Sequence, residues 1–401
     1  MNFFKKIYCR AFQTVFFIAL PFLPYKKPRV LLNKAEVVSV LNKAKIKRVL
    51  IVTNSSKSVI DLTNPLTNEL NKKGILTFLY SEVQPNPTVD NVERGVEIYN
   101  ANACNAIIAF GGGSAMDCAK AVGARIAYPN KSLSRLKGLL KVRKKLPITI
   151  ACPTTAGTGS EVTLAAVITD TKKQYKYTIN SFPLIPSYAL LDAKVTVGLP
   201  SQLTATTGLD ALTHAVEAYI GRSTTRETRT CALEATKLIF ENLYTAYTTP
   251  NDLIARENML KSAYLAGLAF TKSYVGYVHA VAHSLGGKYN VAHGLANSVL
   301  LPVVLKGYGK SVYKKLYELA LYSGVCKKSD SYAVGAQKFI AKIDDLLEKM
   351  QIPKVIEEIR EEDIAEMSSH ADKEANPLYP VPKLFNENEL QTFYYQVMKK
   401  D

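Results

Sequence analysis

One stretch in the second half of the chain collects most of its histidines. Four of only five lie in it: His214, His279, His283 and His293. Asp210 precedes the first of them by four residues within an apolar pattern of helical period, so both side chains should project from one helical face. The same spacing recurs in YVHAVAHSLGG, whose two glycines should end that helix before the next histidine begins another. The pattern therefore predicts separate helices that each carry part of one site. Their carboxylate and imidazoles can act together only if these helices pack side by side.

Such a group of histidines has two interpretations. A single histidine on an apolar helix is most often a core residue whose ring nitrogens find hydrogen bonds. Four clustered histidines with an aspartate and no cysteine instead suit a divalent ion such as Fe(II), Zn(II) or Ni(II), and they differ from a cysteine-rich structural zinc site. The sequence therefore favours a mixed Asp/His metal centre with a catalytic role.

The first half of the chain alternates apolar strand segments with helical ones. RVLIVTN reads as a buried strand, and ILTFLYSEV, NAIIAF and PITIACP read as further strands. Helices are predicted over residues 58–73 and in VERGVEIYNANAC. This alternation predicts an α/β domain with a doubly wound, mostly parallel sheet, which binds ligands at the carboxyl ends of its strands. From about Ser201 helix-period segments predominate, which predicts an all-α C-terminal domain.

Two loops at strand ends are suited to a dinucleotide. Gly111, Gly112, Gly113 and Ser114 follow NAIIAF directly and open the helix SAMDCAKAV. Glycines let the backbone approach a pyrophosphate, and the N–H groups of a helix start bind its charge, although a tight turn would use the same residues. After PITIACP, the loop TTAGTGSEVT offers hydroxyl groups that suit ribose, phosphate and carboxamide.

These motifs together resemble the iron-containing (group III) alcohol dehydrogenase family. GLDALTHAVEAY, HAVAH, NVAHG and GGGSAMDCAK carry the resemblance, which spans about residues 30–400. We expect an N-terminal helix over residues 1–30, an α/β dinucleotide-binding domain over residues 31–200 and a helical metal-binding domain over residues 201–401. The active site would lie in a cleft between the two domains.

The resemblance also implies roles for particular residues. The metal ligands would be Asp210, His214, His279 and His293, and His283 would lie beside the substrate as the catalytic residue. The dinucleotide would contact nine residues: Asn86 in the loop VQPNP, Gly112, Gly113, Ser114, Asp117, Thr154, Thr155, Thr158 and Lys176.

Asn54 departs from the pattern of the family. NAD-preferring relatives often carry an aspartate there, which binds the ribose 2′-hydroxyl and repels a 2′-phosphate. Asparagine is neutral, and Ser55, Ser56 and Lys57 follow it as candidate phosphate contacts. NAD(H) and NADP(H) are therefore both open as cofactors, and Zn(II) is open beside Fe(II).

Residues 3–20 predict a basic amphipathic helix that ends near Pro21. Its apolar run is too short to span a bilayer, and the absence of a small-x-small site argues against a secretory signal, whereas a mitochondrial presequence stays open. We expect the helix to pack on the body of the protein or on a second subunit, or to make weak contact with a membrane surface. We expect it to take no part in catalysis.

Charge and cysteine content restrict the partners and the compartment. The net charge of +17 is concentrated in basic runs, with seven Lys/Arg and no acid in residues 1–35 and nine in residues 118–160. No zinc finger, helix-turn-helix or aromatic-basic RNA motif accompanies these runs, so we expect no nucleic-acid partner. Six scattered cysteines without a CxxC indicate buried, reduced thiols and hence the cytoplasm. His370 lies outside the metal pattern, and we expect it to be structural.

The expected activity is reversible hydride transfer between NAD(P)H and a small alcohol, aldehyde or diol, carried out by a homodimer or higher homo-oligomer. A bound metal would act as a Lewis acid on the substrate oxygen. Two alternatives stay open. One is a zinc-dependent polyol dehydrogenase of the glycerol dehydrogenase type, and the other is a membrane-surface or assembly protein with a vestigial active site.

Overall fold

The structure of the protein is a computed structural model that describes residues 1, 3–171 and 175–399. Its contacts divide the chain into two compact units. The α/β unit is Pro24–Leu199, and the helical unit joins Met1–Leu23 to Pro200–Asp401. The N-terminal helix therefore belongs with the C-terminal half of the chain.

The main sheet of the α/β unit has six parallel strands. Their order is β1 (Arg29–Leu31), β9 (Tyr188–Leu190), β6 (Ile148–Pro153), β4 (Ala106–Gly111), β2 (Arg48–Asn54) and β3 (Leu76–Val83). The predicted parallel, doubly wound sheet is confirmed. The edge strand β1 and its neighbour β9 were not predicted, because a strand of three residues is too short to show a period of two.

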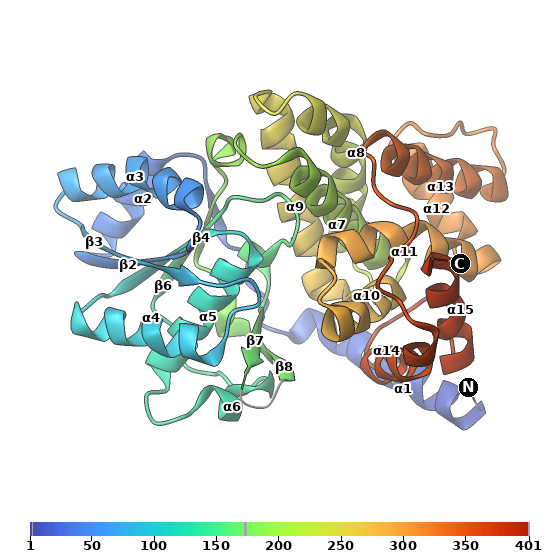
Figure 1. Ribbon diagram of the computed structural model, residues 1–401, viewed down its shortest axis with the longest axis horizontal. Coiled ribbons are helices and arrows are strands. Elements are labelled where there is room, and N and C mark those ends of the chain that lie inside the picture. Colours follow the sequence, from blue (N-terminus) through green and yellow to red (C-terminus); the bar gives the residue numbers. More distant parts are fainter. Residues whose placement is uncertain (2, 172–174, 400–401) are drawn as a thin grey trace. The chain divides into compact units, whose positions relative to one another are not determined.

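Helices cover both faces of this sheet, α2 and α3 on one face and α4 and α5 on the other (Figure 1). They are α2 (Lys34–Lys43), α3 (Lys57–Lys72), α4 (Val89–Ala101) and α5 (Gly113–Ala127), with the short α6 (Leu133–Leu136) after them. Along β4, Ile107 packs into the core on the α4/α5 side and Ile108 into the core on the α2/α3 side. Because both faces are buried, the strand is apolar at every position.

A second, smaller sheet lies outside the predicted pattern. It contains β5 (Gly138–Leu139), β8 (Tyr175–Asn180) and β7 (Ala165–Asp170), in that order. β7 and β8 pair antiparallel, and β5 and β8 pair parallel.

The C-terminal part of the helical unit is all helical, as predicted. Its helices are α7 (Ser201–Ile220), α8 (Arg226–Thr248), α9 (Leu253–Ser273), α10 (Tyr277–Tyr289), α11 (His293–Tyr308), α12 (Tyr313–Tyr322), α13 (Tyr332–Lys349), α14 (Ile364–Ala375) and α15 (Glu387–Val397). Helix α7 is buried on all sides over most of its length and packs against α8, α9 and α11. A helix at the centre of its unit can hold polar side chains away from water.

One predicted helix end was wrong. Helix α10 does not stop at Gly286 and Gly287 but continues to Tyr289. Glycine in a helix costs about 1 kcal/mol relative to alanine, which packing can offset. The helix ends instead at Asn290, whose φ of 57° is left-handed.

The N-terminal helix is α1 (Phe3–Ala19), followed by one 3₁₀ turn over Leu20–Phe22. Its buried residues include Cys9 and Gln13. None of the described helices combines the length and the apolar character that a membrane span requires. All six cysteine side chains are buried, which agrees with the predicted reduced thiols.

Candidate metal centre and dinucleotide loops

The four predicted ligands come from three helices of the helical unit. Asp210 and His214 lie one turn apart on α7, His279 is on α10, and His293 begins α11. One ligand atom from each lies within 4.8 Å of the others. His293 Nε2 is 3.4 Å from Asp210 Oδ1, and His279 Nε2 is 3.9 Å from the same oxygen. The structure thus brings the predicted set together at a spacing that suits one shared divalent ion.

The electrostatics of the cluster favour neutral imidazoles. Asp210, His214 and His279 are buried, whereas His293 is partly exposed. Burial and the neighbouring imidazoles hold the pKa of His279 well below its usual value. Burial also lowers the pKa of His293 to about 4, although Asp210 opposes the shift. Both rings are therefore neutral at pH 7 and keep the lone pair that a metal ion requires.

The residues present fit a metal ion. Among the described residues, the buried Nε2 of His279 makes no hydrogen bond. Buried polar atoms almost always have a partner, so this nitrogen requires an explanation. A metal ion would explain the unpaired nitrogen, because a carboxylate and three imidazoles directed at one point form a donor set that binds first-row divalent ions.

Glu217 determines the orientation of His279. Its Oε2 accepts from His279 Nδ1 at 2.7 Å and from the Gly276 N–H at 2.8 Å, and its Oε1 accepts from the Val278 N–H at 2.8 Å. These three donors require the carboxylate form, while burial raises the pKa of Glu217 to about 7. With the proton of His279 on Nδ1, Nε2 is left with its lone pair towards Asp210.

Neither Glu217 nor a second buried polar residue, Asn297, was predicted. Asn297 Nδ2 donates to Asp210 Oδ1 at 2.7 Å and lies 3.0 Å from His293 Nε2. Glu217 offered a signal in the sequence, because it stands three residues after His214 in THAVEAY and so shares its face of the helix. Asn297 stands four residues after His293 and offered the same signal.

His283 lies beside the cluster with its side chain partly exposed. Its ring stacks on His293 with centroids 5.2 Å apart, and its Nδ1 is 2.6 Å from Glu374 Oε1. The Tyr379 hydroxyl donates to the same oxygen at 2.6 Å. Burial acts to lower the pKa of His283, but the Glu374 carboxylate outweighs it and raises that pKa. Glu374 was not predicted, and His370, four residues before it on α14, is exposed outside the cluster.

In the α/β unit, the glycine loop stands at the carboxyl end of β4. Gly111 has a φ of +150°, which other residues rarely adopt, and Gly112 precedes α5 as its N-cap. A Cβ on Gly113 would lie 3.0 Å from Thr158 Cγ2, so glycine permits the two predicted loops to pack together. The backbone N–H of Thr154 donates to the Gly111 carbonyl at 3.0 Å, which joins the loops a second time.

Asp117 is engaged within the protein. Its Oδ1 accepts from the Ser160 hydroxyl at 2.7 Å, and its Oδ2 accepts from the Val167 N–H at 3.0 Å. Lys120, almost one turn later on α5, donates to Ser160 Oγ at 2.8 Å and to Thr163 Oγ1 at 2.9 Å. This network fastens α5 to the threonine loop. Direct contact of Asp117 with a dinucleotide stays a prediction.

The other predicted cofactor residues lie on different elements of the α/β unit. Asn54 ends β2, the neighbour of β4, and its Oδ1 accepts from the Ser56 N–H at 3.1 Å. Asn86 is exposed in the loop after β3 with a φ of 57°. Lys176 is on β8, opposite Thr169 in the three-stranded sheet. Asn54 and Asn86 thus follow the carboxyl ends of parallel strands, where such sheets bind ligands.

Comparisons with known proteins match both units. Residues 29–193 match the family model described as iron-containing alcohol dehydrogenase, and residues 204–398 match the model described as the C-terminal part of the Fe-containing alcohol dehydrogenase family. A 1,3-propanediol dehydrogenase from Klebsiella pneumoniae is 36% identical over 354 residues, which are 87% of this chain and 91% of that protein.

Solved structures agree with these matches. A crystal structure of 1,3-propanediol oxidoreductase has a TM-score of 0.87 at 34% identity and covers 93% of this chain and 99% of that chain. The sulfoacetaldehyde reductase of Bifidobacterium kashiwanohense in complex with NAD⁺ has a TM-score of 0.82 at 28% identity, covering 94% of this chain and 99% of that chain. The resemblance inferred from the sequence is confirmed, and the chain belongs to the iron-containing alcohol dehydrogenase family.

Proposed function

We propose that the protein is a metal-dependent, NAD(P)-linked alcohol dehydrogenase or aldehyde reductase acting on small alcohols, aldehydes or diols. The observation that carries the proposal is the convergence of Asp210 with three imidazoles in a chain of this family. The matches do not favour a glycerol dehydrogenase-like polyol enzyme or an assembly protein with a vestigial site. Asp210, His214, His279 and His293 would hold the ion, and Fe(II) is the metal we propose.

A bound ion would supply Lewis acidity, polarising a carbonyl oxygen or lowering the pKa of an alcohol. The chain's own residues prepare the site for it. Glu217 keeps the proton of His279 on Nδ1, and Asn297 holds the Asp210 carboxylate by donating to it. These two contacts orient ligand atoms before any ion binds, which lowers the cost of assembling the site.

His283 is the residue we propose to exchange a proton with the substrate oxygen. Glu374 binds its Nδ1, so Nε2 is the nitrogen available for the exchange. The Tyr379 hydroxyl donates to the same carboxylate oxygen and restricts its movement. A stacked, hydrogen-bonded ring beside the cluster suits a general acid or base, which needs a defined position as well as an accessible nitrogen.

For the cofactor, we propose that the glycine loop and the threonine loop bind the dinucleotide phosphates and that Asn54 lies near the adenosine ribose. The packing of Gly113 against Thr158 supports a single composite binding loop. The related sulfoacetaldehyde reductase was solved with NAD⁺, which supports NAD(H) as a cofactor. Because Asn54 carries no charge to repel a 2′-phosphate, we propose that NADP(H) is accepted as well. We further propose a cytoplasmic homodimer, a compartment that agrees with six buried cysteines.

A turnover assay tests the proposal directly. The metal-free protein would be loaded with Fe(II) or Zn(II) and assayed against a panel of alcohols, diols and aldehydes with NADH and NADPH. We expect turnover with Fe(II) that a chelator abolishes and added metal restores. Absence of turnover with every substrate, in protein that binds one metal ion per chain, would contradict the proposed activity.

A further inference from the structure

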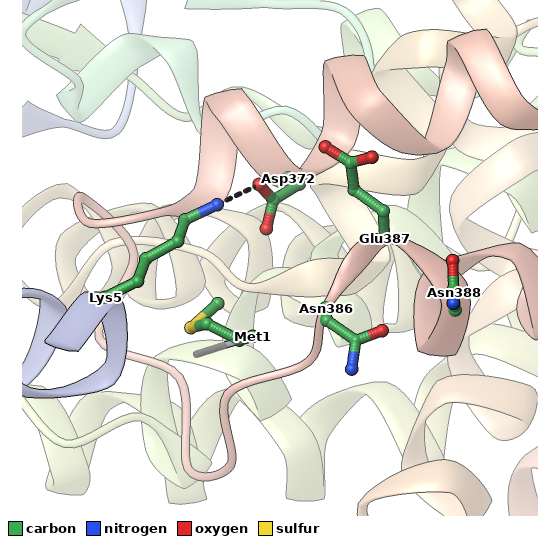
Figure 2. Close-up of a pocket in the computed structure, with 6 residues that line it drawn as sticks. All are labelled: Met1, Lys5, Asp372, Asn386, Glu387 and Asn388. Carbon is green, nitrogen blue, oxygen red and sulfur yellow. Dashed lines mark hydrogen bonds and ion pairs between the residues drawn. The ribbon is translucent and has the colours of Figure 1, made fainter. Parts of the chain in front are cut away.

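The N-terminal helix α1 packs against the rest of the helical unit with its polar side. Lys5 Nζ lies 2.5 Å from Asp372 Oδ2 on α14 (Figure 2). Arg10 donates to the carbonyls of Val381 and Pro382, at 2.7 and 3.1 Å. The Gln13 side chain is only 4% exposed and donates to the Tyr379 carbonyl at 2.7 Å. Polar groups that would otherwise need water are thus satisfied by backbone oxygens and a carboxylate.

The opposite side of α1 is apolar and exposed. We call it the outer face and define it by six exposed residues: Phe3, Phe4, Ile7, Tyr8, Val15 and Ile18. Separations of three, four and seven residues place them on one side of a helix. Phe12 and Phe17 of the same helix are also exposed but lie outside this face. Phe16 on the same helix is only partly exposed, and its ring packs at 5.0 Å from the ring of Tyr274. A continuous apolar helix face in water marks an interaction site.

The outer face is not needed by the dehydrogenase fold. Residues 1–28 precede the first family match, which begins at residue 29, and the second covers residues 204–398. The residues of the metal cluster and of the dinucleotide loops all lie within the two matches. The helix is therefore an addition to the family's catalytic framework, and its partner has to be inferred from its own chemistry.

Charge distinguishes between two possible binding partners of the outer face, a second copy of the chain and a lipid surface. A second copy bound through this face would bring two basic N-terminal segments together, and their like charge opposes that contact, so the proposed homodimer would form through another surface. An anionic lipid surface reverses the sign of that interaction. Residues 1–35 contain seven Lys/Arg and no acid, and Lys6 is exposed on α1 itself. Basic residues near an anionic membrane strengthen binding to it.

The geometry also fits a bilayer surface. Helix α1 has 17 residues and rises about 1.5 Å per residue, so it is long enough to lie flat on a surface, and no described helix could span a membrane. Phenylalanine, tyrosine and isoleucine on one side are the side chains that enter the boundary between headgroups and acyl chains. We propose that the outer face of α1 docks the protein onto an anionic membrane surface, with the helix in the plane of the membrane. This goes beyond the proposed hydride transfer, which does not require it.

Vesicle binding of the full-length, metal-loaded protein tests the proposal. Phosphatidylcholine vesicles with and without phosphatidylglycerol would be sedimented with the wild type and with the double variant Phe4→Ser/Ile18→Ser. We expect binding to the anionic vesicles that falls with added salt and weakens at least tenfold in the double variant, about 1.4 kcal/mol. The kcat and the melting temperature should not change, because both substitutions leave the inward bonds of α1 intact.

Ile254→Ser provides the matched control. Ile254 on α9 is 73% exposed, close to the 79% of Phe4, but it does not belong to the outer face. This variant should bind vesicles as the wild type does. Equal binding to neutral and anionic vesicles, or no binding to either, would overturn the proposal. Light scattering provides a further test. If the wild type forms an oligomer, the double variant does not, and neither binds vesicles, the outer face would belong to a second copy and the proposal would be overturned.

Discussion

Replacing Glu217 by glutamine should weaken metal binding without unfolding the protein. The carboxylate accepts three hydrogen bonds, from His279 Nδ1, Gly276 N–H and Val278 N–H. Glutamine has the same shape but only one acceptor oxygen, and its NH₂ group must face at least one of these donors. Either the Val278 N–H loses its partner, or His279 must move its proton to Nε2, the nitrogen proposed to bind the ion.

Both outcomes have an expected size. A buried donor left without an acceptor costs about 1–3 kcal/mol of folding stability. Loss of a carboxylate that orients a ligating histidine lowers metal affinity about 10- to 100-fold. That range corresponds to about 1.4–2.7 kcal/mol of binding free energy. We therefore expect Glu217→Gln to fold, to melt at a lower temperature and to bind metal one to two orders of magnitude more weakly.

The assay is a chelator competition that yields the metal dissociation constant, together with thermal melts of the metal-free and metal-loaded protein. Glu318→Gln is the control, since Glu318 accepts from the Tyr219 hydroxyl of the same helix α7 but has no hydrogen bond to the cluster. That variant should keep the wild-type dissociation constant. A Glu217→Gln protein whose dissociation constant stays within twofold of the wild type would refute the orienting role of Glu217.

The remaining predictions concern the metal centre and the dinucleotide site. Gly276→Ala should weaken metal binding about tenfold, because its Cβ would lie 2.7 Å from Glu217 Oε1. Gly287→Ala is the control and should bind metal as the wild type does, because the space at its Cβ is open. Equal metal dissociation constants for the two variants would contradict this prediction. His279→Ala should lose the metal by elemental analysis, and His283→Ala should keep it while kcat falls; metal loss in both would make His283 a ligand. Wild-type kcat/KM for NADPH should be within about a hundredfold of that for NADH, about 2.7 kcal/mol, and Asn54→Asp should shift the ratio towards NADH. An unchanged ratio would place cofactor selection elsewhere.

The sequence by itself determined the elements and the spacing of the candidate ligands. The inner strands β2, β4 and β6 were recognisable because a strand buried on both faces is largely apolar. The edge strand β3 was recognisable from its aliphatic and aromatic residues, although several of them are partly exposed. Asp210 and His214 were predicted to share a helical face because a separation of four residues is close to one helical turn. Both inferences depend on the geometry of a few consecutive residues, which the sequence contains in full.

Only the tertiary structure decided which distant groups meet. The sequence contained both Glu217 and His279, but nothing in it indicated that a carboxylate 62 residues away would accept from the imidazole. The same holds for Glu374, which reaches His283 across 91 residues. Pairings of this kind depend on how helices pack, and many arrangements of the same helices satisfy their periodicity.

Helix α1 shows most clearly what a sequence pattern leaves undecided. Its amphipathic pattern was legible in the sequence, but a pattern states only that two sides differ and not which side meets the protein. The polar side faces inward because backbone carbonyls at residues 379–382 and the Asp372 carboxylate lie where Gln13, Arg10 and Lys5 can reach them. Periodicity is a local property of the backbone, whereas the supply of hydrogen-bond partners is set by segments more than 350 residues away.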